Sequence, residues 1–321
     1  MTLLSRIFSF APWGEGDKFD PEFEQALERA AELVEPHLKR SRGWPRRYLR
    51  PIAAALAQAR HVAEALPGPV QIDAAHFASD PFVHALFATP EDIRRSLCSS
   101  RVMHEYVASG VATEAYMLLS MRREEKRTLG MQSAGAIVNR EVPQRLVWFT
   151  DHQLFAPAPT LAGARENLRW LMFDRLLERV AQGVDRLRAE RDRIAGERDH
   201  AVARLHGVDA SRRPALQQAA ERWLKQLGEA TRCLEHDNLA EIFAAVLSHP
   251  EDCLYLREMS LRIDSMGVVC AESGGDEVPP LVFTELIERY QEPRTVVLVH
   301  CPDIHPMTPG ERLEEAARWL G

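Results

Sequence analysis

The feature that most constrains this chain is a long run of apolar residues spaced alternately three and four positions apart. An apolar residue every 3.5 positions on average is typical of a helix whose apolar stripe packs along another helix. The run is interrupted once and then resumes with the same spacing. Its first part comprises Trp170, Phe173, Leu177, Val180, Val184, Leu187, Ile194, Ala201 and Leu205, and its second part comprises Leu216, Ala220, Trp223, Leu227, Ala230 and Leu234. We call these residues the hairpin seam.

The two parts of the seam predict an antiparallel coiled-coil hairpin. The break at residues 206–211 has the glycine and polar residues of a turn, and Pro214 is compatible only with the first turn of a helix. If the chain turns back here, Leu205 lies opposite Leu216 and the rest of the two seams stays in register. The sequence therefore predicts a helical hairpin that closes near residue 210.

Two arginines, Arg191 and Arg198, occupy positions in the seam where an apolar residue is expected. In the predicted register Arg198 faces Trp223, so that its guanidinium group could stack on the indole ring. Alternatively, both long side chains extend past the seam and place their charged groups in solvent. Polar residues at such positions fix the register of two helices at some cost in stability.

The segments around the hairpin predict an α+β fold. Proline follows a capping residue at Asp20-Pro21, Asp80-Pro81 and Thr89-Pro90, which indicates short helices in the N-terminal third. Strand patterns occur at 116–121, 128–132 and 145–155 before the hairpin, and at 253–269, 280–290 and 295–301 after it. The charged run at 122–127 is interpreted as a solvated turn. We expect one mainly antiparallel sheet built from both groups of strands, with the hairpin inserted between them; two separate small sheets are the alternative.

The chain accordingly divides into four expected segments. They are a helical N-terminal region at 1–112, a strand-rich segment at 113–159, the coiled-coil hairpin at 160–236, and a second strand-rich segment with a C-terminal helix at 237–321.

The amino-acid composition limits the classes of protein to which the chain can belong. The net charge is −7, which argues against a nucleic-acid binder as a whole. Only four of the 40 basic residues are lysines, which suggests a bacterium with a GC-rich genome. No apolar stretch reaches the roughly 20 residues that span a bilayer. The five cysteines are scattered and odd in number, which favours reduced thiols and a cytoplasmic location.

One group of residues has the spacing of a structural zinc site. Cys233 and His236 are followed, across a short predicted helix, by His249 and Cys253. Two thiolates and two imidazoles suit tetrahedral Zn²⁺, although the ligand types are rearranged relative to common zinc sites. Cys233 also adjoins the seam, and so it could equally line the end of the hairpin. Apart from this possible zinc ion, no cofactor is expected.

Two further segments could contact a partner. A basic cluster with aromatic residues comprises Lys39, Arg40, Arg42, Trp44, Arg46, Arg47, Tyr48 and Arg50. Charge combined with stacking rings suits nucleic acid or anionic lipid, whereas a solvated loop that neutralises nearby acidic residues is the simpler interpretation. The apolar segment from Leu3 to Ala11 could lie against a membrane interface or against a protein surface.

The sequence contains no phosphate-binding loop, dinucleotide fingerprint, nucleophile elbow or zinc-protease motif. The leading hypothesis is a non-enzymatic interaction or scaffold protein whose projecting hairpin binds a protein partner or a second copy. The first alternative is a peripheral factor that binds an anionic membrane, such as the inner membrane, or nucleic acid through the N-terminal segment and the basic cluster. The second is a zinc protein or an enzyme with a site that no motif reveals.

Overall fold

The computed structural model describes residues 20–110, 113–134, 137–205, 213–235, 237–270, 278–304 and 310. The chain divides into two compact units. Unit 1 consists of residues 1–60 and 172–253, and unit 2 consists of residues 61–171 and 254–321. Two of the three boundaries between the units fall within the helices α3 (Leu49–Ala65) and α8 (Leu161–Leu205), and the third lies between Cys253 and Leu254.

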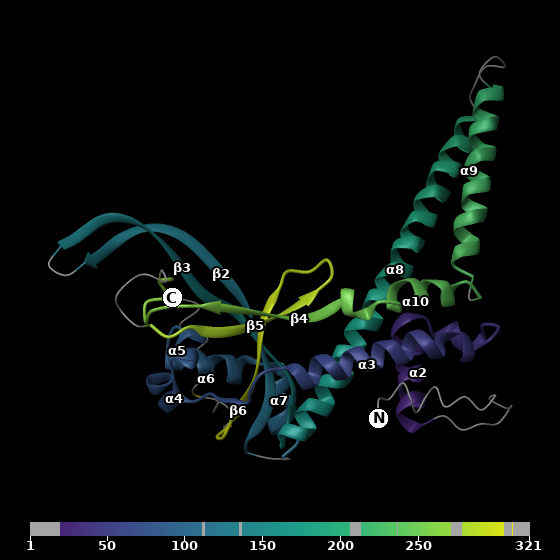
Figure 1. Cartoon of the computed structure of the whole chain (residues 1–321). Helices are drawn as coiled ribbons and strands as arrows, with labels where there is room; N and C mark the ends of the chain where they lie inside the picture. Colours follow the sequence, from purple (N-terminus) through teal and green to yellow (C-terminus); the bar gives the residue numbers. More distant parts are fainter. Residues whose placement is uncertain are drawn as a thin grey trace. The chain divides into compact units, whose positions relative to one another are not determined.

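Unit 1 is helical and contains the predicted hairpin (Figure 1). The expected cap at Asp20 is confirmed, because its side chain accepts a hydrogen bond from the backbone N–H of Glu22. The helices that lie in this unit or enter it are α2 (Pro21–Val34), α3 (Leu49–Ala65), α8 (Leu161–Leu205), α9 (Arg213–Cys233) and α10 (Leu239–Leu247), with short 3-10 turns η1 (Pro36–Arg40), η2 (Arg46–Tyr48) and η3 (Pro250–Asp252).

Unit 1 has a core of its own. Leu38, Ile52, Phe173, Leu177 and Phe243 come from four different segments, and each is fully buried. On each helix the apolar residues recur on one face, and the burial of this face stabilises the folded unit.

Unit 2 contains a single sheet with the strand order β3-β2-β6-β5-β4, in which all neighbours are antiparallel. The short strand β1 pairs with β6 in parallel. The strands are β1 (Val70–Gln71), β2 (Ala115–Ala134), β3 (Ile137–Ala158), β4 (Leu254–Leu261), β5 (Leu281–Glu288) and β6 (Arg294–Cys301). The predicted α+β fold is confirmed, because strands from both sides of the long helix join one mainly antiparallel sheet.

Short helices pack on one face of this sheet. Val83, Leu86 and Met103 from the helices share a buried cluster with Met117 and Val297 from the strands. The caps predicted at Asp80 and Thr89 are both present. The helices are α4 (Ala74–Ser79), α5 (Pro81–Leu86), α6 (Pro90–Ser99) and α7 (Arg101–Ala108).

The interpretation of residues 122–127 as a turn is wrong. These residues continue β2, and their partners on β3 run from Thr150 opposite Arg122 to Arg145 opposite Arg127. The patterns at 116–121 and 128–132 therefore belong to one strand. The charged run resembled a turn because this part of β2 has few buried side chains, so that no alternation of apolar and polar residues marks it as a strand.

A β-turn region after β4 reaches the outer edge of β3. The backbone N–H of Val147 donates to the carbonyl of Gly267, and the N–H of Val269 donates to the carbonyl of Arg145, both at 2.8 Å. Gly267 has a φ of +81°, and a Cβ atom there would lie 2.8 Å from the Val147 carbonyl oxygen. This close approach requires glycine.

Candidate functional site

The two halves of the long helix α8 differ sharply in burial. We call residues 172–187 proximal α8, and we call residues 188–205 together with α9 the distal hairpin. The buried side chains of proximal α8 are Met172, Phe173, Leu176, Leu177, Arg179, Val180 and Val184, which cover more than one face of the helix. In distal α8 only Ile194 and Ala201 are buried, and both belong to the seam. Proximal α8 is therefore part of the core, whereas distal α8 is covered along a single stripe.

The seam of α9 is only half-buried. Its side chains at Leu216, Ala220, Trp223, Leu227, Ala230 and Leu234 are all less exposed than the residues around them, together with Ala219, but none is buried. The burial pattern of both helices thus reproduces the predicted spacing of three and four. Figure 1 draws α9 running back along distal α8. The pairing of individual seam residues and the supercoiling of the two helices stay predictions.

Two large aliphatic residues of the distal hairpin are exposed. Val202 is 40% exposed and directly follows the seam residue Ala201, and Leu224 is 59% exposed and directly follows the seam residue Trp223. Both therefore occupy the same heptad position. In two antiparallel helices related by a local two-fold axis, this position lies on the same side of the seam in each helix. We call this side of the distal hairpin the apolar flank.

The seam arginines pair with carboxylates on their own helix. The Nε atom of Arg191 donates to Asp192 Oδ1 at 2.9 Å, and the Nε atom of Arg198 donates to Asp199 Oδ1 at 2.9 Å. Among the interactions described for distal α8 and α9, none joins Arg198 to the Trp223 ring. The arrangement agrees with arginines that extend past the seam.

Polar contacts also distinguish proximal α8. Arg29 Nη1 of α2 lies 2.5 Å from Asp174 Oδ2, and at the boundary with the distal hairpin Arg188, its first residue, forms an ion pair with Glu35. Burial raises the pKa of the Asp174 carboxyl group, and the hydrogen bond and charge of Arg29 only partly offset this rise. The second carboxylate oxygen of Asp174 is buried without a hydrogen-bond partner.

Much of the predicted basic cluster is used within unit 1. Lys39 Nζ lies 2.9 Å from Glu28 Oε1. The backbone N–H of Arg42 donates to the side chain of Asp237, and the Arg47 guanidinium group donates to the Asp237 carbonyl at 2.7 Å. The contacts of Arg42 and Arg47 hold the segment before α10, but of these three residues only Lys39 and Arg47 use their charged groups, because Arg42 takes part through its backbone.

The aromatic members of the cluster are also partly withdrawn from solvent. Tyr48 is fully buried, and its ring packs edge-on against Phe243 with centroids 5.1 Å apart. Burial raises the pKa of its hydroxyl group. Trp44 lies against Tyr48 with centroids 5.0 Å apart. Tyr48 therefore has no free face for stacking, whereas Arg40, Arg46 and Arg50 are exposed. Contact of these arginines with an anionic partner stays a prediction.

A shallow groove of about 470 Å³ lies beside Trp44. Besides Trp44 and Lys39, it is lined by Pro21, Glu24, Gln25, Leu27, Glu28 and Pro45. The charged residues of its lining are Glu24, Glu28 and Lys39. Because Lys39 is paired with Glu28, the negative charge of Glu24 is left unbalanced. The groove is therefore poorly suited to a phosphate group.

Three of the four predicted zinc ligands lie within the described residues, and His236 lies outside them. Cys233 is exposed, and His249 is exposed with its Nδ1 atom 3.3 Å from Glu251 Oε1. Cys253 is buried, with its Sγ atom 3.6 Å from the carbonyl oxygen of Val246. Within the described ranges, no three His, Cys, Asp or Glu side chains are grouped to hold a metal ion. Zinc binding by the full set stays a prediction.

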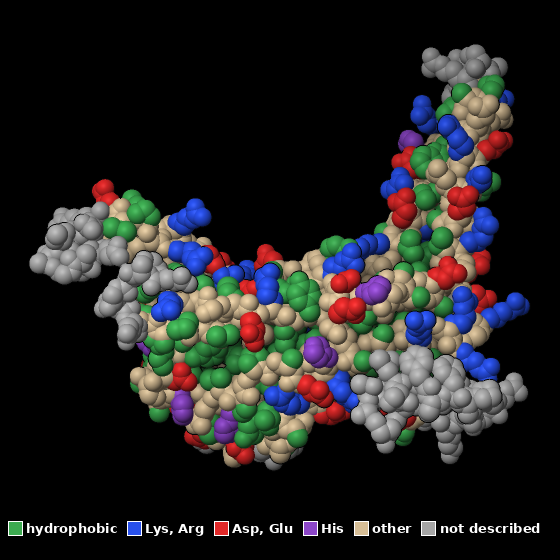
Figure 2. Space-filling model, viewed as in Figure 1, with side chains coloured by type: hydrophobic (Ala, Val, Ile, Leu, Met, Phe, Trp, Pro, Cys, Tyr) green, Lys and Arg blue, Asp and Glu red, His purple; other side chains and the backbone are tan. Residues whose placement is uncertain are grey.

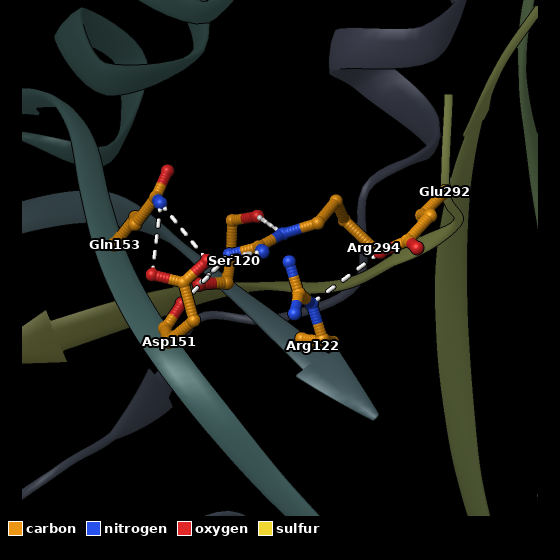
Figure 3. Close-up of polar contacts among 6 residues, drawn as sticks. All are labelled: Ser120, Arg122, Asp151, Gln153, Glu292 and Arg294. Carbon is orange, nitrogen blue, oxygen red and sulfur yellow. Dashed lines mark hydrogen bonds and ion pairs between the residues drawn. The ribbon is translucent and has the colours of Figure 1, made fainter. Parts of the chain in front are cut away.

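Unit 2 contains a polar cluster that the sequence did not predict (Figure 3). Arg294 at the start of β6 donates from Nη1 to Asp151 Oδ2 at 2.6 Å and from Nε to Ser120 Oγ at 3.1 Å. Gln153 Nε2 donates to Asp151 Oδ1 at 3.0 Å, and Arg122 Nε lies 3.4 Å from Glu292 Oε2. Figure 3 shows these side chains converging where β2, β3 and the β5–β6 turn meet.

The cluster fixes an irregular part of the sheet. The β2–β3 register shifts between Ser120 and Arg122, and Asp151 has a φ of +51°. Burial acts to raise the pKa of the Asp151 carboxyl group, but the hydrogen bonds from Arg294 and Gln153 and the charge of Arg294 lower it below its usual value. Asp151 is therefore a charged anchor and is poorly suited to donate a proton near neutral pH.

Cys301 also lacks the properties of a nucleophile. It ends β6 and is buried. Burial and the negative charge of Asp73 raise the pKa of its thiol to about 12, so that the thiolate is scarce near neutral pH. Cys301 is therefore a small apolar residue at the end of a strand.

None of the helices in the described ranges combines the length and apolarity needed to cross a membrane. The chain matches no protein-family model, and no curated protein or solved structure shows significant similarity to it.

Proposed function

We propose that this chain is a non-enzymatic interaction protein whose distal hairpin binds a protein partner or a second copy. The observation that carries the proposal is the contrast within α8. Proximal α8 is buried on several faces, whereas Ile194 and Ala201 are the only buried residues described for the distal hairpin. A long element that adds so little to the core is better explained by contact with another molecule than by a need for stability.

The apolar flank is the part of the distal hairpin best suited to this contact. Val202 and Leu224 are exposed, and the adjacent seam residues Trp223 and Leu227 are only half-covered. A third helix laid along this flank would cover these four side chains together, as in helical bundles. Burying each exposed aliphatic side chain would favour association by about 1.5–3 kcal/mol if burial were complete.

The decisive variant changes the apolar flank and leaves the seam intact. Val202→Lys with Leu224→Lys places two charges in the proposed contact, and both positions are solvent-exposed, so that the fold should be preserved. Gln226→Lys is the matched control, because Gln226 is exposed on α9 on the other side of the seam. Self-association is measured by sedimentation equilibrium, and partner binding by quantitative mass spectrometry of complexes purified from the native host.

We expect the double variant to lose at least about tenfold in association, and the Gln226→Lys control to retain it. Equal association of the intact chain, the double variant and the control would contradict the proposal. Circular dichroism of all three proteins verifies that helix content is unchanged.

The same proposal places the protein in a bacterial cytoplasm. Its support is the arginine-rich composition and the scattered cysteines.

A further inference from the structure

The strands β2 and β3 extend beyond the sheet of unit 2. Pairing of β2 with β6 ends at Met121 opposite Thr295. The outer edge of β3 is bonded to the 267–269 segment only as far as Arg145. In the described part of the chain, the remaining residues of the two strands pair only with each other, as Figure 1 shows. We call residues 122–134 and 137–147 the β2–β3 arm.

The end of this arm has no core of its own. In residues 128–131 and 141–146 no side chain is buried. A two-stranded ribbon without a packed face is at best marginally stable in water. The arm therefore persists because it continues a stable sheet, and its outer part contributes little to folding.

The outer end of the arm is apolar and uncharged. Leu129 is 65% exposed and Met131 is 67% exposed. Residues 128–139 contain no charged side chain. Large aliphatic side chains that are exposed to this extent, and grouped, mark a surface that contacts another molecule.

Basic residues surround the apolar end. Residues 122–147 contain six basic and three acidic side chains, a net charge of +3, whereas the whole chain has −7, which leaves −10 for the rest. Arg127 lies directly opposite Arg145, and like charges in this position are destabilising. Arg145 lies 3.7 Å from Glu125, but within the described ranges Lys126 and Arg127 have no ion pair.

We propose that the end of the β2–β3 arm binds the surface of an anionic lipid bilayer. Leu129 and Met131 enter the boundary between headgroups and acyl chains, and Arg127 and Arg145, which pair across the two strands on the face of Leu129, face the lipid phosphates. Apolar insertion combined with basic residues is the usual basis of peripheral membrane binding. Figure 2 shows blue side chains along the arm next to green ones near its end. Aliphatic rather than aromatic side chains at this end favour lipid over single-stranded nucleic acid, which binds mainly by stacking on rings.

The test uses the full chain and sedimentation with vesicles. One set of vesicles contains phosphatidylcholine alone, and the other contains phosphatidylglycerol in addition. The test variant is Leu129→Glu with Met131→Glu, and the control is Met266→Glu, which changes a methionine that is 81% exposed in a turn outside the arm. Because all three positions are exposed, the sheet should remain folded in each protein.

We expect the intact chain to bind the anionic vesicles, to bind less at high salt, and to leave the neutral vesicles largely unbound. The double variant should lose at least about tenfold in partition, and Met266→Glu should not. Arg127→Glu should weaken binding severalfold, and Arg127→Lys should restore it.

Two results would overturn the proposal. One is the absence of binding to anionic vesicles at low salt. The other is unchanged binding of the double variant, which would assign the contact to another segment. Retention on duplex DNA that the double variant abolishes, without vesicle binding, would identify nucleic acid as the ligand instead. None of these results bears on the distal hairpin, because the arm belongs to the other unit.

Discussion

Proximal α8 and distal α8 are parts of one continuous helix with the same spacing of apolar residues, yet only the first is packed on several faces. Phe173, Leu177 and Val180 are fully buried, whereas beyond residue 187 burial is restricted to one stripe. The same heptad pattern can therefore serve two purposes. In proximal α8 it builds a core, and in the distal hairpin it keeps two helices together while leaving a flank exposed.

The largest expected effect concerns the proximal seam. Leu177→Ala removes a fully buried side chain and leaves a cavity, which should lower the free energy of unfolding by about 2–5 kcal/mol. Denaturant unfolding monitored by circular dichroism measures this change. A loss below about 1 kcal/mol would mean that proximal α8 is not part of the core, which would contradict the contrast between proximal and distal α8.

The next effect concerns the ion pair of proximal α8. Arg29→Met removes the partner of Asp174, whose other carboxylate oxygen is already buried without a hydrogen bond. The expected loss is about 1–3 kcal/mol near neutral pH. The exposed pair of Arg191 and Asp192 provides the control, since Arg191→Met should cost less than about 0.5 kcal/mol.

The cost of Arg29→Met should also depend on pH. Because burial raises the pKa of Asp174, the folded protein binds a proton at this carboxyl group more readily than the unfolded chain does. At this carboxyl group, lowering the pH therefore favours the folded state. It does so more strongly in the Arg29→Met protein, where no guanidinium group stabilises the charged carboxylate of Asp174. Unfolding experiments between neutral and mildly acidic pH should show the cost shrinking as the pH falls. A cost that grows on acidification would contradict this sign.

The last effect on stability concerns the distal seam. Ile194→Ala should lower the free energy of unfolding by roughly 1 kcal/mol, since only one neighbouring helix surrounds the site and the space can partly close. The direct comparison with Leu177→Ala in the same denaturant series sharpens the contrast between the two halves of α8. Equal losses would show that the distal hairpin is packed as tightly as the core.

The sequence predicted those parts of the structure that depend on local periodicity. Helix caps at Asp20, Asp80 and Thr89 and the spacing of the seam are encoded by residues a few positions apart. The α+β fold followed because strand patterns flank the helical run on both sides. Local patterns were sufficient for the seam because a periodic apolar stripe becomes the least exposed face of its helix.

Other features could not be predicted because they join distant residues or lack burial. The cluster of Ser120, Asp151 and Arg294 unites three strands that only the folded sheet brings together. Tyr48 is buried by Phe243, nearly two hundred positions away, so that its basic neighbours in the sequence gave the wrong impression of its exposure. The charged run at 122–127 carries no apolar alternation, because none of its side chains is buried.

The most direct test of the central claim removes the end of the distal hairpin. Residues 192–229 are replaced by a short glycine-asparagine turn that joins Arg191 to Ala230, which the predicted register places opposite each other. The account predicts that the shortened chain keeps the thermal stability of unit 1 to within a few degrees and loses association with the partner or the second copy. A shortened chain that associates as strongly as the intact protein, or that no longer folds, would contradict it.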